Sequence, residues 1–346
     1  MTGPRSSSGD SARLRHLDGW RGLSLLFVLV GHFSHLSSWI APLGVEMFFV
    51  LSGRLMAELL IVRRQPLRAF LWRRVTRIWP ALWTYIGVMS LALAVSALWG
   101  DHRNALAGAL ASMTFTTNYL AGVVSVPYFD HVWSLSVEEH CYLLLALVTL
   151  LARRRAGPAV AGALLLTAAA GVSGWWQSAG GADGYYTYLR TDTRAGSVLL
   201  PFALYLLAQR PRVAAVLARL PWLSAVAFAL GCWLTAGPWG PWRFTVGTLA
   251  LAVAVVGVDR LPGPCSRLLG WRPLAVIGTA SFSLYLWQQP FMLLWRAGVP
   301  ASLCLLGAFA CGWWSYARVE QPLRRRLNAA GPRGLSRCPR ADRAPA

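Results

Sequence analysis

The chain has 346 residues, of which 56% are hydrophobic and only 13% are charged. Soluble domains carry about a quarter charged residues, so this composition excludes an ordinary soluble domain and indicates a membrane protein. The net charge of +20 comes from 33 basic residues, all arginine, which occur in short clusters between apolar runs. Such clusters set the topology of membrane helices, whereas a nucleic-acid surface needs a continuous basic face. We therefore expect the lipid bilayer as a partner and no nucleic acid.

The apolar runs predict an all-α, polytopic integral membrane protein, because each run is close to the length that a helix needs to cross a bilayer. We count about ten spans, and the one at 194–209 is the weakest because Arg194 interrupts its start. The spans lie at about 17–38, 43–62, 79–99, 132–151, 158–177, 194–209, 222–237, 242–258, 273–295 and 300–318.

The placement of the arginines gives the orientation. If the N-terminus is cytoplasmic, 26 of the 33 arginines fall on the cytoplasmic side. The remaining seven are split between outer loops and span interiors: Arg103, Arg190, Arg194, Arg243 and Arg296 outside, and Arg21 and Arg54 within spans. This asymmetry follows the positive-inside rule, so both termini are expected in the cytoplasm and the protein in the plasma membrane.

The chain divides into three parts. Residues 1–16 form a cytoplasmic N-terminal segment, residues 17–326 a single membrane domain, and residues 327–346 a Pro-, Arg- and Gly-rich tail that we expect to be disordered. The segment at 101–131 is predicted to be a long outer loop. The six cysteines form no CxxC pair, so neither a zinc site nor a disulfide framework is expected, and the metal prediction is none.

Ionisable side chains inside membrane helices are costly, which makes them the first candidates for function. In HLDGWRGLSLLFVLVGHF (16–33), Arg21 and His32 are eleven residues apart and share one helix face, about 16 Å apart along the axis. Asp18 lies one turn before Arg21 and can form an ion pair with it. The alternative for His32 is a purely structural hydrogen bond to a neighbouring helix.

Two further stretches carry charge at span margins. In RRVTRIWPALW (73–83), Arg74 and Arg77 present two guanidinium groups on one helix face, a geometry that suits phosphate. On these residues alone, topology-setting charge with an aromatic anchor at Trp79 is the favoured explanation. In HVWSLSVEEHCYLLLALV (131–148), Glu138 and Glu139 enter an apolar run without a nearby cation. We expect Glu139 at the membrane interface and Glu138 turned inward, with His32 as a candidate partner.

These stretches, in this order, resemble the motifs of the membrane-bound acyltransferase family 3 over nearly the whole chain. GVEMFFVLSGRLM (44–56), SFSLYLWQQPF (281–291) and VEQPLRRR (319–326) resemble the family's other motifs. The resemblance implies transfer of an acyl group, commonly acetyl from acetyl-CoA, to a carbohydrate hydroxyl, with acyl-CoA as co-substrate and no bound cofactor. It also implies that four residues are essential: His32, Arg21, Arg74 and Arg77. Glu138 matches the glutamate of the WSLxVE block.

Four positions depart from the family pattern: Arg54, Gln288, His140 and Cys141. They suggest an unusual acceptor pocket without changing the proposed catalytic set. Because no appended esterase-like domain is visible, transfer is expected to be completed within the membrane domain.

Together these observations predict a mechanism. Arg74 and Arg77, with Arg21 nearby, would bind the donor phosphates at the cytoplasmic face, and the thioester would reach His32. His32 would act as general base, oriented by Glu138, while a covalent acyl-histidine is equally compatible with the sequence. Asp18, Glu139 and Arg194 are supporting candidates. The rival interpretation is a transporter or flippase that uses His32 and Glu138 as a proton relay.

The acceptor is the least defined partner. Surface polysaccharide, lipid-linked sugar and a glycosylated small-molecule metabolite all fit the resemblance. Several outer-loop aromatic residues can stack on sugar rings, although such residues are commonly interfacial anchors. They are Tyr119, Tyr128, Trp175, Trp176, Tyr185 and Tyr186.

Overall fold

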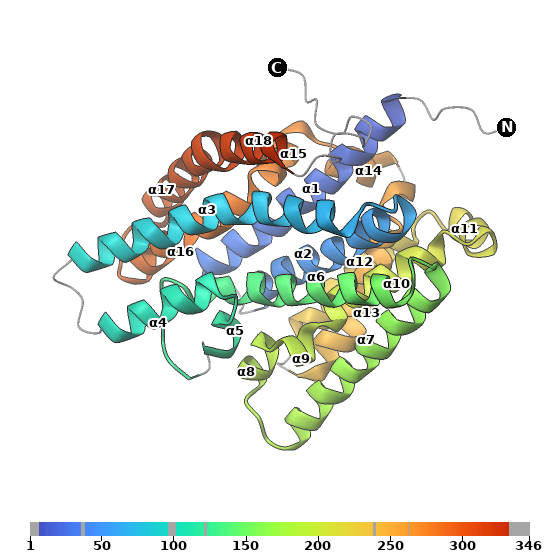
Figure 1. The fold of residues 1–346 in the computed structure, drawn as a ribbon, viewed down its shortest axis with the longest axis horizontal. Coiled ribbons are helices and arrows are strands. Elements are labelled where there is room, and N and C mark those ends of the chain that lie inside the picture. Colours follow the sequence, from blue (N-terminus) through green and yellow to red (C-terminus); the bar gives the residue numbers. More distant parts are fainter. Residues whose placement is uncertain are drawn as a thin grey trace.

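The fold is a bundle of helices, seen in a computed structural model (Figure 1). The structure describes residues 7–35, 39–95, 102–120, 123–237, 240–261 and 263–331. Within these ranges every regular element is helical, which confirms the predicted all-α class. Most of the expected disordered tail, and the first six residues, lie outside the described residues.

Each predicted apolar run contains helix, although the first and third helices begin well before their runs and the run at 273–295 is divided between two helices. In chain order the first half contains α1 (Ser7–His32), α2 (Ile40–Ala57), α3 (Leu67–Val95), α4 (His102–Met113), α5 (Thr117–Leu120), α6 (Trp133–Leu151), α7 (Ala156–Ala179), α8 (Gly184–Leu189) and α9 (Thr191–Arg194). The second half contains α10 (Gly196–Ala208), α11 (Pro211–Ala218), α12 (Leu223–Ala236), α13 (Thr248–Val256), α14 (Gly263–Leu269), α15 (Arg272–Thr279), α16 (Ser281–Arg296), α17 (Ala301–Ser315) and α18 (Gln321–Ala330).

Short helical turns of other types connect some of these helices. Three π-helical turns continue α2, precede α13 and join α17 to α18, at Glu58–Val62, Arg243–Gly247 and Tyr316–Glu320. Two 3-10 turns lie at Asp130–Val132 and Val258–Arg260. The segment expected as a long outer loop is therefore largely helical, because α4, α5 and the first 3-10 turn occupy it.

Three helices are long and apolar enough, by length and composition, to cross a membrane: α3, the continuous helical segment Asp130–Leu151 that contains α6, and α7. A fourth is added if α11 and α12, which are bent by 84°, form one broken span. Many other predicted spans are present as helices but are shorter, such as α10 with 13 residues and α17 with 15. The ten-span arrangement and the cytoplasmic termini are not confirmed and stay predictions.

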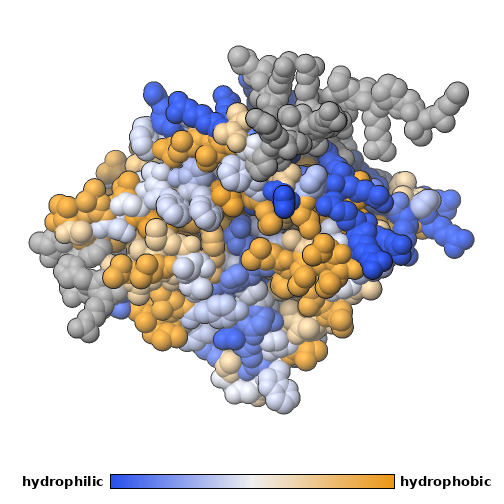
Figure 2. All heavy atoms as spheres, viewed as in Figure 1, coloured by the Kyte–Doolittle hydropathy of each residue, from blue (hydrophilic) through white to orange (hydrophobic). Residues whose placement is uncertain are grey.

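The surface of the described residues is rich in apolar side chains, as expected for a protein in lipid. Leu91, Val95, Leu151 and Leu165 are each more than 60% exposed. In Figure 2 hydrophobic residues cover much of the visible face, and hydrophilic residues gather mainly toward the side that carries α11. Since water would penalise so much exposed apolar surface, the natural surroundings of this face are acyl chains.

The helix that carries Arg21 and His32 sits in the middle of the bundle because it has small residues at its contacts. α1 packs against both α15 and α2. A Cβ atom on Gly22 would approach the carbonyl oxygen of Leu274 to 2.1 Å, so only glycine allows this contact with α15. Close approach through glycine is the usual way for membrane helices to gain packing energy, and here it fixes the height of α1 in the bundle.

Candidate functional site

A cavity opens between α1, α2, α3, α6 and α16, and it brings together most of the predicted site. It holds about 800 Å³ of space, including its open mouth. Arg21, Arg74, Arg77 and Glu138, which lie far apart in the sequence, all line it. We call it the basic cavity. Its other walls are mainly apolar or hydroxyl-bearing: Val45, Phe48, Phe49, Leu51, Ser52, Leu55, Ile78, Ser134, Leu135, Tyr142, Ser281, Phe282, Tyr285 and Leu286.

Arg21 enters the basic cavity from α1 and is held by its neighbour one turn earlier. Its Nη1 atom donates to Oδ1 of Asp18 at 2.7 Å, and both side chains are largely covered. The predicted Asp18–Arg21 ion pair is therefore confirmed. Because one carboxylate oxygen occupies only one of five guanidinium N–H groups, Arg21 keeps donors for a ligand.

Arg74 and Arg77 enter from α3 and have a different environment. The Cζ atom of Arg74 lies 4.9 Å from the ring centroid of Tyr142 and 5.7 Å from that of Phe70. Aromatic faces favour a cation without consuming its hydrogen-bond donors. Within the described part of the chain, neither arginine forms an ion pair with a carboxylate. The two half-buried guanidinium groups are thus available to an anion that enters the cavity.

Glu138 lies in the same cavity, but its partner differs from the predicted one. The hydroxyl group of Ser52 on α2 donates to Oε1 of Glu138, and the hydroxyl group of Tyr142 donates to Ser52 Oγ at 3.1 Å. This chain of hydrogen bonds joins α2 to α6 across the cavity wall. The neighbouring Glu139 is half-buried rather than at an exposed interface, and its Oε1 atom has no hydrogen-bond partner among the described residues.

His32 lies at the far end of α1, at a second cavity. We call it the outer cavity, because this end of α1 is predicted to face the outside. It is open and holds about 1100 Å³ of space, and its walls also include His35, Trp295 and Arg296. The Nδ1 atom of His32 lies 2.8 Å from Oε1 of Gln288. An amide oxygen only accepts, so this bond places the proton on Nδ1 and leaves Nε2 as a free lone pair. The orienting partner of the imidazole is therefore Gln288, one of the positions that depart from the family pattern, instead of Glu138.

α16 contributes residues to the walls of both cavities. Ser281, Phe282 and Tyr285 from its first turns line the basic cavity, and Gln288, one turn further, holds His32. The next residue is fixed as well, because Nε2 of Gln289 donates to the carbonyl oxygen of Pro127 at 2.5 Å.

Several residues of this site were missed by the sequence reasoning. The hydroxyl groups of Tyr285 and Ser134 are 2.8 Å apart in the cavity wall, and Tyr285 also donates to the carbonyl oxygen of His131 at 2.8 Å. The ring of His131 is buried between Tyr85 and Tyr285, at centroid distances of 5.3 and 5.5 Å. All of these residues belong to motif stretches or adjoin them. They were not predicted, because uncharged hydroxyl and aromatic groups do not stand out within an apolar run as charged residues do.

Arg194, a predicted supporting residue, lies outside the basic cavity. Its Nη2 atom donates to Oε2 of Glu46, and both side chains are almost fully buried. The guanidinium group is also within 6 Å of three aromatic rings, those of Phe49, Tyr188 and Phe244. Glu46 was missed, although a carboxylate inside an apolar run was a readable signal.

Arg54, which with Arg21 was predicted to lie within a span, also has a carboxylate partner. It donates to Oδ2 of Asp259, and its Cζ atom lies 5.3 Å from the ring centroid of Tyr205. Because Arg54 is fully buried and absent from both cavities, its role here is to join α2 to the chain that follows α13.

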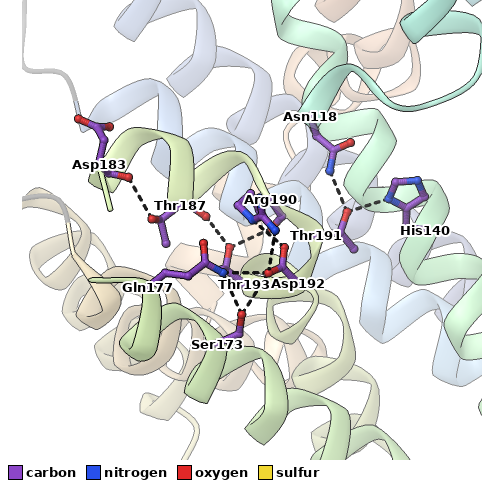
Figure 3. Close-up of polar contacts among 10 residues, drawn as sticks. All are labelled: Asn118, His140, Ser173, Gln177, Asp183, Thr187, Arg190, Thr191, Asp192 and Thr193. Carbon is purple, nitrogen blue, oxygen red and sulfur yellow. Dashed lines mark hydrogen bonds and ion pairs between the residues drawn. The ribbon is translucent and has the colours of Figure 1, made fainter. Parts of the chain in front are cut away.

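A polar network holds α8 and α9 near α6 and α7 (Figure 3). Nδ1 of His140 lies 2.7 Å from Oγ1 of Thr191, to which Nδ2 of Asn118 also donates at 2.9 Å. On the other side, Oδ2 of Asp192 accepts hydrogen bonds from Ser173 and Gln177 of α7. The position of His140 is therefore explained by its anchoring of this segment.

The fold and site together define a class: a membrane protein with a cavity lined by three arginines and a second cavity that contains an imidazole at the far end of α1. No cluster of three or more potential metal ligands occurs among the described residues. No solved structure matches the chain. A family model described as an acyltransferase domain matches residues 14–317, so the chain belongs to this acyltransferase family, whose members transfer acyl groups at the membrane.

The relatives include O-acetyltransferases. The peptidoglycan O-acetyltransferase OatA of Listeria monocytogenes is 27% identical over 89% of this chain and 55% of its own length. The O-acetyltransferase OatA of Staphylococcus aureus is 26% identical over 80% of this chain and 50% of its own length. The chain therefore spans about half the length of these two relatives. Family membership favours the acyltransferase interpretation over the transporter or flippase.

Proposed function

We propose that the protein is a membrane-embedded O-acyltransferase that moves an acetyl group from acetyl-CoA to a hydroxyl group of a carbohydrate. The observation that carries this proposal is the joint placement of Arg21, Arg74 and Arg77 in one cavity, with His32 about three turns further along α1. The imidazole therefore lies at a distance from the three guanidinium groups. Acetyl-CoA requires such a separation, because its phosphates are at one end of the molecule and its thioester is at the other.

The three arginines would bind the phosphates of the donor. Guanidinium groups bind phosphate oxygens through charge-assisted, often bidentate hydrogen bonds, and two of the three have no carboxylate competitor in the described structure. The apolar walls of the basic cavity suit the uncharged arm of the donor. α16 then guides that arm toward Gln288 and His32.

His32 would act as the general base. Its Nε2 atom takes the proton of the acceptor hydroxyl group, the oxygen attacks the thioester carbonyl carbon, and the C–S bond breaks. The proton passes from His32 to the departing thiolate, so the products are the ester and free CoA. Gln288 keeps the imidazole in the required tautomer, which is the task that a carboxylate performs in a catalytic triad.

Glu138 would act through the wall of the basic cavity. Its bond to Ser52 keeps α2 and α6 together, and its negative charge near the arginines limits their mutual repulsion. Glu138 is therefore proposed as a positioning residue. Asp18 plays the corresponding role for Arg21, and Arg194 stabilises the fold through Glu46.

The acceptor is proposed to be a polysaccharide on the outer side of the membrane. This rests on the names of the relatives, which describe a peptidoglycan O-acetyltransferase and an O-acetyltransferase. The corresponding topology has ten spans with both termini cytoplasmic, so the basic cavity faces the cytoplasmic donor and His32 the outside. Reporter fusions after residues 154 and 298 should report the cytoplasmic and the outer side, respectively.

The deciding experiment replaces His32 by Ala in purified membranes supplied with radiolabelled acetyl-CoA and a peptidoglycan glycan. General base catalysis contributes roughly 10²–10⁴-fold, so transfer should fall by at least two orders of magnitude while the protein stays inserted and folded. The control is His16→Ala, since His16 is held by Ser266 outside both cavities. Near-normal transfer by His32→Ala would end the proposal. Label retained on the wild-type protein would indicate a covalent acyl-histidine.

A further inference from the structure

The outer cavity contains a second cation beside the imidazole. Arg296 is the last residue of α16 and lines the same cavity as His32. Its side chain is exposed, and it forms no ion pair in the part of the chain that the structure describes. Gln288, which holds His32, lies eight residues earlier on the same helix, a rise of about 12 Å. A flexible arginine side chain at that height can reach a ligand whose hydroxyl group is at His32.

We propose that Arg296 forms an anion subsite for the acceptor, so that the preferred acceptor is a sugar with a carboxylate or phosphate close to the hydroxyl group that is acylated. The inference rests on the proposed function, because it takes His32 as the residue that acts on the hydroxyl group. It adds the chemical class of the acceptor, which the family membership does not give.

The other predicted outer arginines whose side chains are described all have partners. Arg190 forms an ion pair with Asp192 at 3.0 Å, and Arg194 binds Glu46. Arg243 donates through Nε to the carbonyl oxygen of Gly237 at 3.0 Å. Arg296 differs from these three, since its guanidinium group faces an open cavity with none of these contacts. The positive-inside rule disfavours an arginine on this side of the membrane. A ligand anion would explain why Arg296 is nevertheless present beside the proposed base without an ion-pair partner among the described residues.

The rest of the outer cavity suits a sugar. The ring of Trp295 lies 5.1 Å from that of His35 and 6.2 Å from that of Phe33, which gives an aromatic wall beside the cation. Burial raises the pKa of Tyr185 on α8, the negative charge of Asp130 raises it further, and Arg296 lowers it. Tyr185 therefore lies within electrostatic range of Arg296, and Asp183 caps its helix through bonds to the Tyr185 and Tyr186 amides.

The test compares two acceptors that differ only in charge: an oligosaccharide of N-acetylglucosamine and N-acetylmuramic acid, and the same oligosaccharide with its carboxylates converted to methyl esters. Binding to the purified protein is measured by calorimetry and acetyl transfer by radiolabel. The wild type should bind and use the charged form about ten-fold better, as expected for about 1.4 kcal/mol from one charge-assisted hydrogen-bonded pair. A phosphorylated sugar and its neutral parent form a second pair, which tells phosphate from carboxylate recognition.

Arg296→Gln should remove the preference, and Arg296→Lys should keep most of it because the charge is retained. Arg267→Gln, an exposed arginine of α14 outside both cavities, is the matched control and should behave as the wild type. Equal use of charged and neutral acceptors by the wild type, or an unchanged preference in Arg296→Gln, would overturn the inference while leaving the acyltransferase proposal intact. If transfer fails with every acceptor but the charged form still binds through Arg296, the proposed function fails and the anion subsite stands.

Discussion

The arginines inside this protein fall into two groups that differ in their partners. Arg54 and Arg194 are fully buried, and each binds a carboxylate from a distant part of the chain. Arg74 and Arg77 line an open cavity and form no ion pair with a described carboxylate. A cation without a counter-charge is costly away from water, so the second pair is retained only where an anionic ligand or water reaches it. For these four arginines, a carboxylate partner distinguishes structural charge from charge proposed to bind a ligand. Arg21 combines both features, since it pairs with Asp18 and lines the basic cavity.

The largest effect should follow from breaking the most buried pair. Arg194→Met leaves Glu46 charged and without its partner in the core, which should lower the free energy of unfolding by about 3–5 kcal/mol. Thermal unfolding in detergent, followed by size-exclusion chromatography, measures this. Arg194→Met combined with Glu46→Gln should recover part of the loss, because the uncompensated charge is gone. An unchanged unfolding temperature in the single variant would contradict the structural role.

Removing a cation from the basic cavity should affect the donor instead of the fold. Arg77→Gln should raise KM for acetyl-CoA at least ten-fold, about 1.4 kcal/mol, because a charge-assisted contact to phosphate is lost. The unfolding temperature should stay within the experimental error. Arg68→Gln is the matched control, since Arg68 is exposed on the same helix and absent from the cavity. If both variants leave the dependence on donor concentration unchanged, the arginines of α3 serve topology alone.

The pair between Arg54 and Asp259 should show an intermediate loss of stability, because the Asp259 side chain keeps 29% exposure to solvent. Asp259→Asn should lower the free energy of unfolding by roughly 1–3 kcal/mol, as for a hydrogen bond to a charged group. KM for the donor should not change, since neither residue lines the basic cavity. A raised KM without any loss of stability would place Arg54 with the ligand-binding group.

The smallest effect is expected in the wall of the basic cavity. Ser52→Ala removes the hydroxyl group between Tyr142 and Glu138 and should cost about 1 kcal/mol, seen as a few-fold lower kcat with nearly unchanged KM. Ser52→Thr keeps the hydroxyl group and should restore most of the rate. A larger loss in Ser52→Thr than in Ser52→Ala would show that the space, and not the hydrogen bond, matters at this position.

Much of the fold was readable because hydrophobic runs report helices directly. The runs at 222–237 and 300–318 became α12 and α17 within a few residues, whereas α1 begins well before its predicted run at 17–38. The loop expected at 101–131 was less well predicted, since α4 and α5 are helices whose apolar faces are diluted by polar residues. Whether each helix crosses the membrane depends on length and tilt, which the runs alone do not define.

The site was only half readable. The charged residues Arg21, Arg74, Arg77 and Glu138 stood out against apolar sequence and indeed line one cavity. Their hydrogen-bond partners did not stand out. Ser52 and Tyr142 are uncharged, and Gln288 had been noted only as a departure from the family pattern, although it holds His32.

By itself, the sequence determined that the chain is helical, apolar and basic, and which of its side chains are too costly to bury without a reason. It also determined the offset between Arg21 and His32, because both lie on one helix with a fixed rise per residue. Tertiary structure alone decided which charges are paired, since the partners of Arg54 and Arg194 come from residues about 205 and 148 positions away. Long-range packing likewise decided that Gln288 forms the hydrogen bond to His32 and that Arg296 has no ion-pair partner among the described residues. A sequence pattern cannot predict such contacts, because it does not show which helices lie side by side.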